Sequence, residues 1–252
     1  MNKVGPFSDL RINHDQEEKF WAESLALIEA DQEMVKRLQI IERALALIFG
    51  YTIEYTSKTI DENTVQMLGV RLFNAGAAGL KLALSGYYQI AFHQARDIME
   101  TGYLIDYLRT SPGQISVWKT ADRGTRRKLF DPVKIRIALD ERDGDKQMRR
   151  AAEYAKLSEL ASHASYHGFR LTARQGFGEL GPFVEIVNLK AWLHEMVLRL
   201  GPAAYLYSRH FPQAEAKLVR FSEEFGTDLI VGFKDDSGYR EDVEEANDES
   251  VR

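Results

Sequence analysis

Apolar residues recur at steps of three and four along most of this chain, and this periodicity limits its fold more than any other feature. The steps match the turn of an α-helix. Residues 15–55 are therefore predicted to be helical, in two pieces. The apolar positions there are Phe20, Leu25, Ile28, Val35, Leu38, Ile41, Leu45 and Ile48.

Capping and breaking residues divide the rest of the chain into further helices. Asp61 is predicted to cap the next helix, and Ser111-Pro112-Gly113 ends a helix predicted over residues 87–109. Short helices are expected between residues 113 and 145, one of them capped by Asp131 with Pro132 in its first turn. The remaining helices are predicted at residues 146–166, 187–209 and 213–225.

Glycines have two different roles in these patterns. Four glycines and a proline interrupt the helical pattern near residues 168–183, where residues 169–173 fit a short strand or an extended loop. The glycines of Asn74-Ala-Gly-Ala-Ala-Gly79 follow no strand, so they indicate close helix packing rather than a phosphate-binding loop. The sequence thus predicts an all-α fold: one helical, bundle-like domain with a short irregular or hairpin segment near residues 168–183.

The net charge of −5 belongs to the end of the chain. Residues 234–252 hold eight acids and three bases, so residues 1–233 are neutral. Few large apolar side chains occur in the acidic stretch, which leaves little to offset the entropy cost of ordering it. We therefore predict a single helical domain over residues 1–233 and an acidic, disordered tail over residues 234–252.

A basic segment survives inside the neutral domain. Across residues 119–136, only Asp122 and Asp131 oppose seven bases. Such a cluster is the electrostatic pattern of phosphate contacts, so RNA is a candidate partner. The bases are Lys119, Arg123, Arg126, Arg127, Lys128, Lys134 and Arg136.

The composition also sets an expectation about location. The chain has no cysteine, which excludes disulfides and thiolate metal sites and is compatible with a reducing compartment. Its start lacks an apolar signal core, and Lys81 or Glu42 interrupts the longest apolar stretches. A soluble, cytoplasmic protein without membrane contact is expected.

Two histidines four residues apart mark the candidate site. His163 and His167 end the helix predicted over residues 146–166, and their spacing would place both imidazoles on one side of it. The helix predicted over residues 87–109 carries the other polar groups. They lie at similar spacings, so a polar site between the two helices is predicted: His93, Arg96, Asp97 and Glu100.

A helical wheel at about 100° per residue separates two faces on the helix predicted over residues 87–109. Its polar face includes Tyr103 and Tyr107, large rings that a fully exposed face would not be expected to carry together. The polar stripe is therefore expected inside the bundle. The apolar face holds Ala91, Phe92, Ala95, Ile98, Met99 and Gly102, and the polar face holds Gln89, His93, Arg96, Asp97, Glu100, Tyr103 and Tyr107.

Three interpretations of this site stay open. In the first, a histidine is a general acid or base, Arg96 stabilises a phosphate-like anion, and the basic segment guides RNA. In the second, the site holds a divalent metal, although a His-x3-His pair without the glutamate of zinc proteases is a weak signal. In the third, the polar residues are structural or bind without catalysis. The metal ligands would be His93, Asp97, His163 and His167, and no other cofactor is expected.

Two short motifs resemble a broad bacterial family of all-helical proteins. They are Arg96-Asp-Ile-Met-Glu100-Thr-Gly-Tyr-Leu and Tyr154-Ala-Lys-Leu-Ser158-Glu-Leu-Ala-Ser-His163. The resemblance covers residues 65–210 and implies an all-helical fold without an established activity. The matching positions are Arg96, Glu100, Tyr154, Ser158 and His163.

The chain is more distantly similar to HEPN domains, helical bundles many of which are dimeric RNases. Their signature places an arginine four to six residues before a histidine. No histidine here has an arginine at that spacing, so Arg96 would have to replace it from another helix. The two resemblances imply a bacterial or phage protein.

We therefore expect a cytosolic helical protein with a polar inter-helix site, HEPN-like and acting on or binding RNA. The alternative is a non-enzymatic protein-interaction module, and the third candidate is a metal-dependent hydrolase. The sequence leaves open a protein partner, a homo-oligomer and whether the protein is an enzyme. The predicted site residues are Arg96, Glu100 and His163 for catalysis, and Tyr154, Ser158, Arg123, Arg126, Arg127 and Lys128 for substrate binding.

Overall fold

The computed structural model describes residues 10–174 and 176–235, and it confirms the predicted all-α class. The long helices are α1 (Leu10–Glu29), α2 (Gln32–Phe49), α3 (Ile60–Leu84), α4 (Tyr88–Thr110), α9 (Ile186–Ser208) and α10 (Ala216–Asp235). Shorter helices are α5 (Gln114–Thr120), α6 (Arg123–Leu129), α7 (Pro132–Asp143) and α8 (Arg149–Leu157). The irregular elements are the π-helical turns η2 (Gly50–Glu54) and η3 (Ser158–Ser162), the 3₁₀ turn η4 (Gly168–Thr172) and the strands β1 (Ala173–Arg174) and β2 (Phe177–Gly178).

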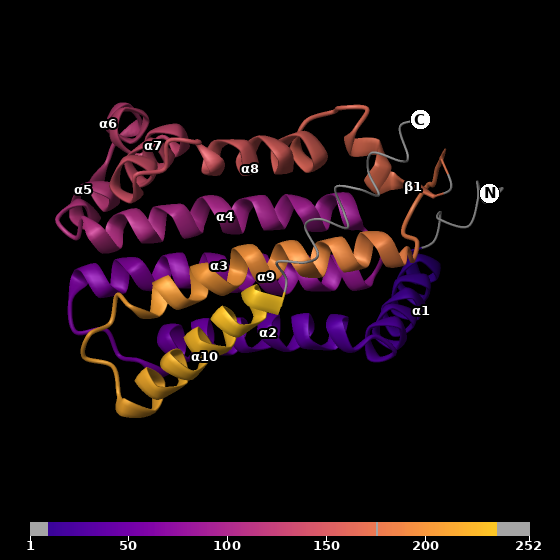
Figure 1. Ribbon diagram of the computed structural model, residues 1–252, viewed down its shortest axis with the longest axis horizontal. Helices are drawn as coiled ribbons and strands as arrows, with labels where there is room; N and C mark the ends of the chain where they lie inside the picture. Colours follow the sequence, from indigo (N-terminus) through magenta and orange to yellow (C-terminus); the bar gives the residue numbers. More distant parts are fainter. Residues whose placement is uncertain (1–9, 175, 236–252) are drawn as a thin grey trace.

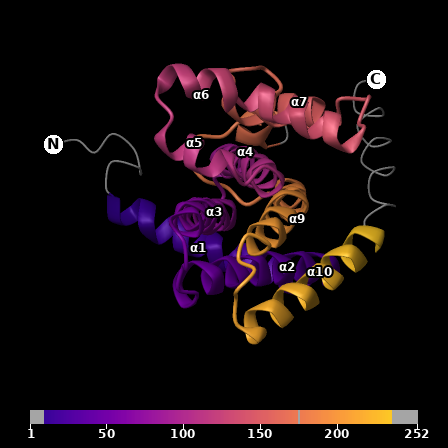
Figure 2. The ribbon, with the colours of Figure 1, turned by 90° about the vertical axis from the view of Figure 1, so that its left-hand side faces the viewer.

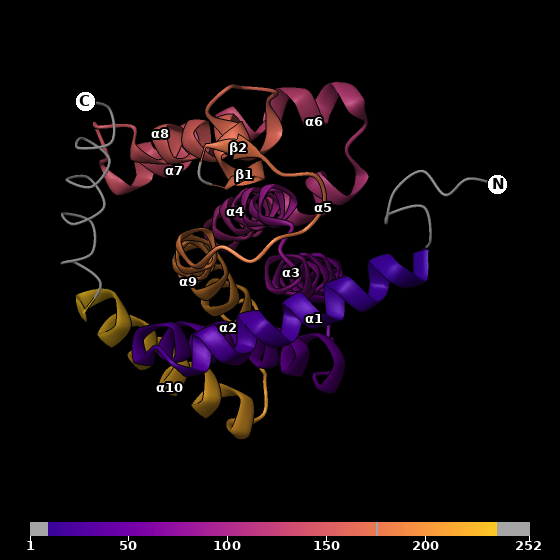
Figure 3. The same ribbon diagram turned by 90° about the vertical axis from the view of Figure 1, so that its right-hand side faces the viewer.

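Four long helices, α2, α3, α4 and α9, form the centre of the molecule (Figures 1 and 2). α4 packs against α3 and α9, while α2 packs against α9 and α3. α1 crosses one end of this group and contacts α2, α3 and α9 (Figure 3). On its other side, α4 is covered by α7, α8 and η3, so α4 lies between two layers of the fold (Figure 1).

Large aromatic side chains fill the core between these helices. Trp192, Tyr51, Tyr88, Tyr207 and Phe225 are among the largest fully buried side chains. Burial of a large apolar side chain contributes about 1.5–3 kcal/mol relative to leaving it exposed. The core therefore joins residues from α9, η2, α4 and α10, and it holds α4 in a fixed position.

Small residues in α3 allow close helix packing, as the glycine pattern predicts. A Cβ atom on Gly76 would lie 2.9 Å from Leu45 Cδ2 and 3.2 Å from Leu200 Cδ2. A Cβ atom on Gly69 would lie 2.3 Å from the Tyr207 hydroxyl oxygen. The distances of 2.3 and 2.9 Å are shorter than real Cβ contacts, so these glycines allow α2 and α9 to approach α3 closely.

Two predicted N-caps have different outcomes. Asp131 accepts a hydrogen bond from Val133 N at 3.0 Å, and Pro132 is the first residue of α7, as predicted. Asp61 does not cap α3, because the helix begins one residue before it. The N-cap is Thr59, whose backbone is extended and whose hydroxyl accepts from Glu62 N at 3.0 Å.

Three predicted boundaries are wrong. The helix expected over residues 146–166 comprises α8 and η3 and ends at Ser162. Residues 169–173 were expected to form a short strand or an extended loop, but η4 occupies residues 168–172. The antiparallel hairpin of β1 and β2 follows it. α10 continues beyond residue 225 to Asp235 and crosses the expected domain boundary at residue 233. The rest of the predicted tail lies outside the described residues.

One described helix, α3, is long and apolar enough to cross a membrane by length and composition alone. Of its most apolar window, 44% is buried inside the fold, and core helices pass the same test. The expected cytoplasmic location without membrane contact stays a prediction.

Candidate functional site

Part of the polar stripe of α4 faces a neighbouring helix, as expected, whereas His93 is exposed and Asp97 pairs with Arg71 of α3. Its members follow steps of four, three, four and three residues, the spacing with which one helix packs along another. The facing segment is α8 with η3, which runs antiparallel to α4 (Figure 1). We call this contact the polar seam, and its α4 residues are Gln89, His93, Arg96, Glu100 and Tyr103.

Arg96 is the central residue of the polar seam. Its Nε donates to Ser158 Oγ at 2.9 Å, and its Nη2 donates to the Tyr154 hydroxyl and pairs with Glu100 Oε1 at 2.9 Å. The Arg96 and Glu100 side chains are 23% and 27% exposed, so the ion pair is half-buried. The structure thus brings together four of the five residues that carry the family resemblance.

The start of the polar seam is bonded through η3. Gln89 Nε2 donates to Ala161 O at 3.1 Å, and His93 Nδ1 lies 3.1 Å from Ser162 Oγ. The π turn closes with His163 N donating to Ser158 O at 2.9 Å, a bond that spans five residues. In this wider turn the hydroxyls of Ser158 and Ser162 both contact side chains of α4. Such π turns are frequent at functional sites.

The far end of the polar seam is more buried. The Tyr103 hydroxyl donates to Glu153 Oε2 at 3.4 Å, and Arg199 Nη1 of α9 donates to the same oxygen at 2.6 Å. Burial and the nearby Glu153 carboxylate raise the pKa of Tyr103 to about 12. Tyr103 therefore stays protonated at neutral pH and acts as a hydrogen-bond donor.

His163 and His167 do not share a helix, so the prediction that both lie on one helical side is wrong. The chain leaves the π turn at His163 in an extended conformation, and His167 precedes η4. Both side chains are exposed. Gly168 contributes to this ending, since a Cβ atom there would lie 2.8 Å from Leu160 O.

The four alternative metal ligands are not assembled as a ligand set. Asp97 pairs with Arg71, and His93 contacts Ser162. Over residues 10–174 and 176–235, no group of three or more histidine, aspartate or glutamate side chains is arranged to hold a metal ion. A tight protein site needs at least three such ligands.

The chemistry of the polar seam is limited by its own hydrogen bonds. Arg96 directs Nε and Nη2 to Ser158, Tyr154 and Glu100, so these donors already have partners inside the protein. His163 makes no side-chain hydrogen bond or ion pair with the residues that the structure describes. The polar seam therefore joins α4 to α8 and η3 through hydrogen bonds. The catalytic roles of Arg96, Glu100 and His163 stay predictions.

Arg136 differs from the other bases of the basic segment, because it is buried rather than on the surface. Its side chain is only 6% exposed, and its Cζ lies 3.9 Å from the centre of the Tyr154 ring. Two of its buried nitrogens, Nε and Nη1, have no hydrogen-bond partner within the described part of the chain. Arg136 is thus tied to the polar seam through Tyr154.

A network of ion pairs, which the sequence analysis missed, joins α4 to α7 and α8. Asp106 accepts from Arg142 Nη1 at 2.9 Å and Nη2 at 2.8 Å. Asp143 pairs with Arg142 and Arg150, and Arg150 Nη1 also donates to Asp140 at 2.6 Å. These guanidinium groups lower the pKa of Asp143 to about 2.

Six bases of the predicted basic segment do lie on the surface: Lys119 on α5, and five others on α6 and the start of α7. The two acids of the segment are used as helix caps. Asp122 accepts from Thr125 N at 2.7 Å, which lowers its pKa, and Asp131 caps α7. Neither acid forms an ion pair with a base of the segment. We call the five bases on α6 and α7 the α6 basic surface: Arg123, Arg126, Arg127, Lys128 and Lys134.

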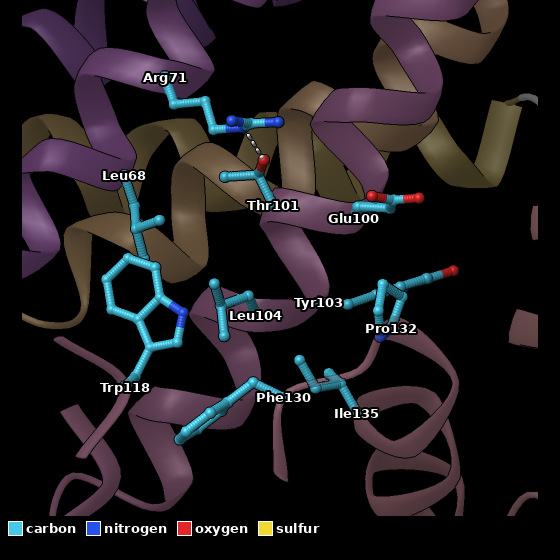
Figure 4. A pocket seen from close by; sticks show the side chains of 10 residues that line it. All are labelled: Leu68, Arg71, Glu100, Thr101, Tyr103, Leu104, Trp118, Phe130, Pro132 and Ile135. Carbon is cyan, nitrogen blue, oxygen red and sulfur yellow. Dashed lines mark hydrogen bonds between the residues drawn. The ribbon is translucent and has the colours of Figure 1, made fainter. Parts of the chain in front are cut away.

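A cavity of about 180 Å³ is lined by residues of α3, α4, α5 and α7 and by Phe130, which follows the last residue of α6 (Figure 4). One end is polar, where Arg71 Nε donates to Thr101 Oγ1 at 3.2 Å beside Glu100. The other end is apolar. Its walls are Leu68, Tyr103, Leu104, Trp118, Phe130, Pro132 and Ile135.

The sequence carries one signal for this cavity, which the patterns described above do not include. Trp118 and Phe130 stand on either side of the basic run, and aromatic residues interleaved with bases are typical of nucleic-acid contacts.

No protein-family model, curated protein or solved structure matches this chain.

Proposed function

We propose that this protein binds RNA through the α6 basic surface. One observation carries the proposal: five exposed bases lie within residues 122–134, and the two acids of that stretch, Asp122 and Asp131, are used as N-caps. A cap carboxylate interacts with backbone N–H groups, so it neutralises its neighbours less than an ion-paired carboxylate does. Arg126 still interacts electrostatically with Asp122, but the positive charge of the other bases is available to contact phosphates.

The charge distribution supports a local contact rather than general attraction. The whole chain carries −5, so it repels a polyanion unless a basic face turns toward it. α6 is seven residues long, about 10 Å at the rise of an α-helix. Its bases therefore lie within reach of only a few successive phosphates, which favours a short binding site.

RNA binding without cleavage is the form of the proposal that the polar seam supports. Arg96 has its hydrogen bonds inside the protein, with Ser158 and Tyr154, and Glu100 is its ion-pair partner. A residue that stabilises a transition state needs donors aimed at the reacting group. RNA cleavage that is lost in Arg96→Ala and His163→Ala would instead restore the catalytic roles predicted from the sequence.

The proposal is tested by titrating the protein with a short single-stranded RNA at several salt concentrations. The double variant Arg126→Ala/Arg127→Ala should bind more weakly. Each lost phosphate contact should reduce the slope of log affinity against log salt by about 0.7. The control is Lys19→Ala/Lys36→Ala, which removes the same charge from exposed positions on α1 and α2. Absence of RNA binding by the wild type, or equal loss in both double variants, would overturn the proposal.

A protein-interaction module is the second candidate, because three large apolar side chains are almost fully exposed near the hairpin. Tyr166 is 91% exposed, Phe177 is 80% and Leu180 is 87%. Clustered exposed apolar side chains often mark a contact with another protein. A Tyr166→Ser/Phe177→Ser variant should bind RNA as the wild type does, so the two candidates are separable.

A further inference from the structure

The cavity and the α6 basic surface are built from one segment. Trp118 comes from α5, Phe130 follows the last residue of α6, and Pro132 and Ile135 lie on α7. The bases are exposed, and the cavity lies between this segment, α3 and α4. Lys128 lies two residues before Phe130, and Lys134 lies one residue before Ile135, so bases of the α6 basic surface directly flank residues of the cavity wall in the chain.

The cavity has an apolar part and a polar end (Figure 4). Apolar side chains from α3, α4, α5 and α7 form most of its wall, while Arg71, Glu100 and Thr101 stand together at the other end. Glu100 offers acceptor oxygens. Arg71 has more N–H groups than its bonds to Thr101 and Asp97 use. A matching guest has apolar faces and a polar edge.

The size of the cavity limits that guest. Sites for drug-sized ligands measure about 300–1,000 Å³. This cavity, at about 180 Å³, is smaller and suits one planar ring system. A nucleobase has this form, since both its faces are apolar and its edge carries hydrogen-bonding groups.

Two aromatic rings of the wall are placed for contact with such a ring. Phe130 is 8% exposed, and Tyr107 holds it edge-on, with ring centres 6.3 Å apart at 79°. Trp118 is half-buried and lines the cavity opposite Leu104. A buried, oriented Phe130 and a partly accessible Trp118 form a surface on which a base can pack.

We propose that the cavity receives one unpaired base of a single-stranded RNA whose phosphates contact the α6 basic surface. This inference rests on the proposed RNA binding and names the form of RNA that is bound. A base inside a duplex is stacked and paired, so it cannot enter a side pocket without being pulled out. The protein accordingly prefers single-stranded RNA to double-stranded RNA of the same sequence.

The test compares the affinity for a short single strand with that for the same strand annealed to its complement. The wild type should prefer the single strand. Trp118→Leu should weaken single-strand binding roughly tenfold, the effect of losing one stacked base, and leave duplex binding unchanged. Trp118→Phe is the matched control, because it keeps an aromatic face and should retain most of the preference. A melting curve for each variant checks that the fold is intact.

Tryptophan fluorescence gives a second readout. Stacking of a base on Trp118 should quench emission in the wild type, and the quenching should be absent in Trp118→Phe although that variant still binds. Trp21 and Trp192 remain in both proteins, so the difference reports Trp118 alone.

The outcomes separate the two proposals. Equal affinity for single and double strands, with no effect of Trp118→Leu, overturns the base pocket and leaves RNA binding through α6 standing. Absence of any RNA binding overturns both. Binding of anionic phospholipid vesicles in place of RNA overturns both as well, because it would assign the basic surface to a membrane.

Discussion

The guanidinium of Arg136 lies 3.9 Å from the centre of the Tyr154 ring, and the Tyr154 hydroxyl accepts a hydrogen bond from Arg96. Tyr154 thus connects two arginines. Arg96 is ion-paired with Glu100, whereas Arg136 pairs with no carboxylate of the described residues. A cation over an aromatic ring contributes about 0.5–2 kcal/mol, less than the cost of burying an unpaired charge. Arg136 is therefore expected to destabilise the fold.

Arg136→Met should raise the free energy of unfolding by about 1–2 kcal/mol, because it replaces a buried charge with an apolar side chain of similar length. Urea denaturation monitored by circular dichroism measures this. Arg126→Met, at an exposed position on α6, is the control and should change stability by less than about 0.5 kcal/mol. A loss of stability in Arg136→Met would show that the guanidinium has a partner in solution.

Replacing Arg96 should destabilise the protein through the polar seam. Arg96→Met removes the donors to Ser158 and Tyr154 and leaves the half-buried Glu100 without its cation. We expect a loss of about 2–3 kcal/mol, and about 1 kcal/mol for Ser158→Ala. The control is Arg71→Met, whose side chain is 59% exposed and whose ion pair with Asp97 should contribute less than about 1 kcal/mol. Equal losses of stability for Arg96→Met and Arg71→Met would show that the polar seam does not stabilise the contact between α4 and α8.

A pair of glycine substitutions tests the close packing of α3. Gly69→Ala places a methyl group 2.3 Å from Tyr207 and 2.6 Å from Thr52 Oγ1, so we expect a loss of about 1–3 kcal/mol from overpacking. Gly113→Ala has nothing within 4 Å of the new atom and a φ of −60°. It should leave stability unchanged or raise it by about 0.4–1 kcal/mol. Thermal melting of both variants decides whether the approach of α9 to α3 is as close as described.

The ion pairs around Asp143 predict a dependence of stability on pH. The pKa of this carboxyl is about 2 in the fold against a usual value of 3.8, because Arg142 and Arg150 favour its charged form. A lowered pKa contributes stability above the usual value and loses it as the pH falls toward the folded value. The free energy of unfolding should therefore decrease between about pH 4 and pH 2.

Asp143→Asn should weaken this pH dependence and reduce stability at neutral pH. Asp15→Asn, at an exposed position on α1, serves as the control and should follow the wild-type curve. Denaturation at a series of pH values is the measurement. If stability in Asp143→Asn still decreased between about pH 4 and pH 2 as in the wild type, carboxylates other than Asp143 would be responsible for the pH dependence.

Much of the fold follows from local patterns in the chain. The capping of α7 by Asp131 with Pro132 next to it depends on atoms within two residues, so it is visible in the sequence. The polar stripe of α4 is equally visible. Its two tyrosines predict that other parts of the chain cover this face: α8 covers Tyr103, and Phe130 packs against Tyr107.

The ends of α8 and α10 could not be predicted in the same way. Residues 158–166 contain no proline, and the helical pattern continues through them. The helix ends early because η3 bonds to α4 through Ser158 and Ala161, and because Gly168 must approach Leu160 O. These contacts join parts of the chain that local propensity does not connect.

The all-α class, the long helices and the polar face of α4 could be predicted from the sequence, because they depend on interactions within about one helical turn. Only the tertiary structure decided that Arg96 bonds to Tyr154 and Ser158 about sixty residues away. It also decided that Arg136 is buried while Arg126 is exposed, and that Trp118 and Phe130 line one cavity. The physical reason is that α8 and the α5–α7 segment dock on α4 as units. Their register depends on the shape of the whole core and not on the residues near each contact.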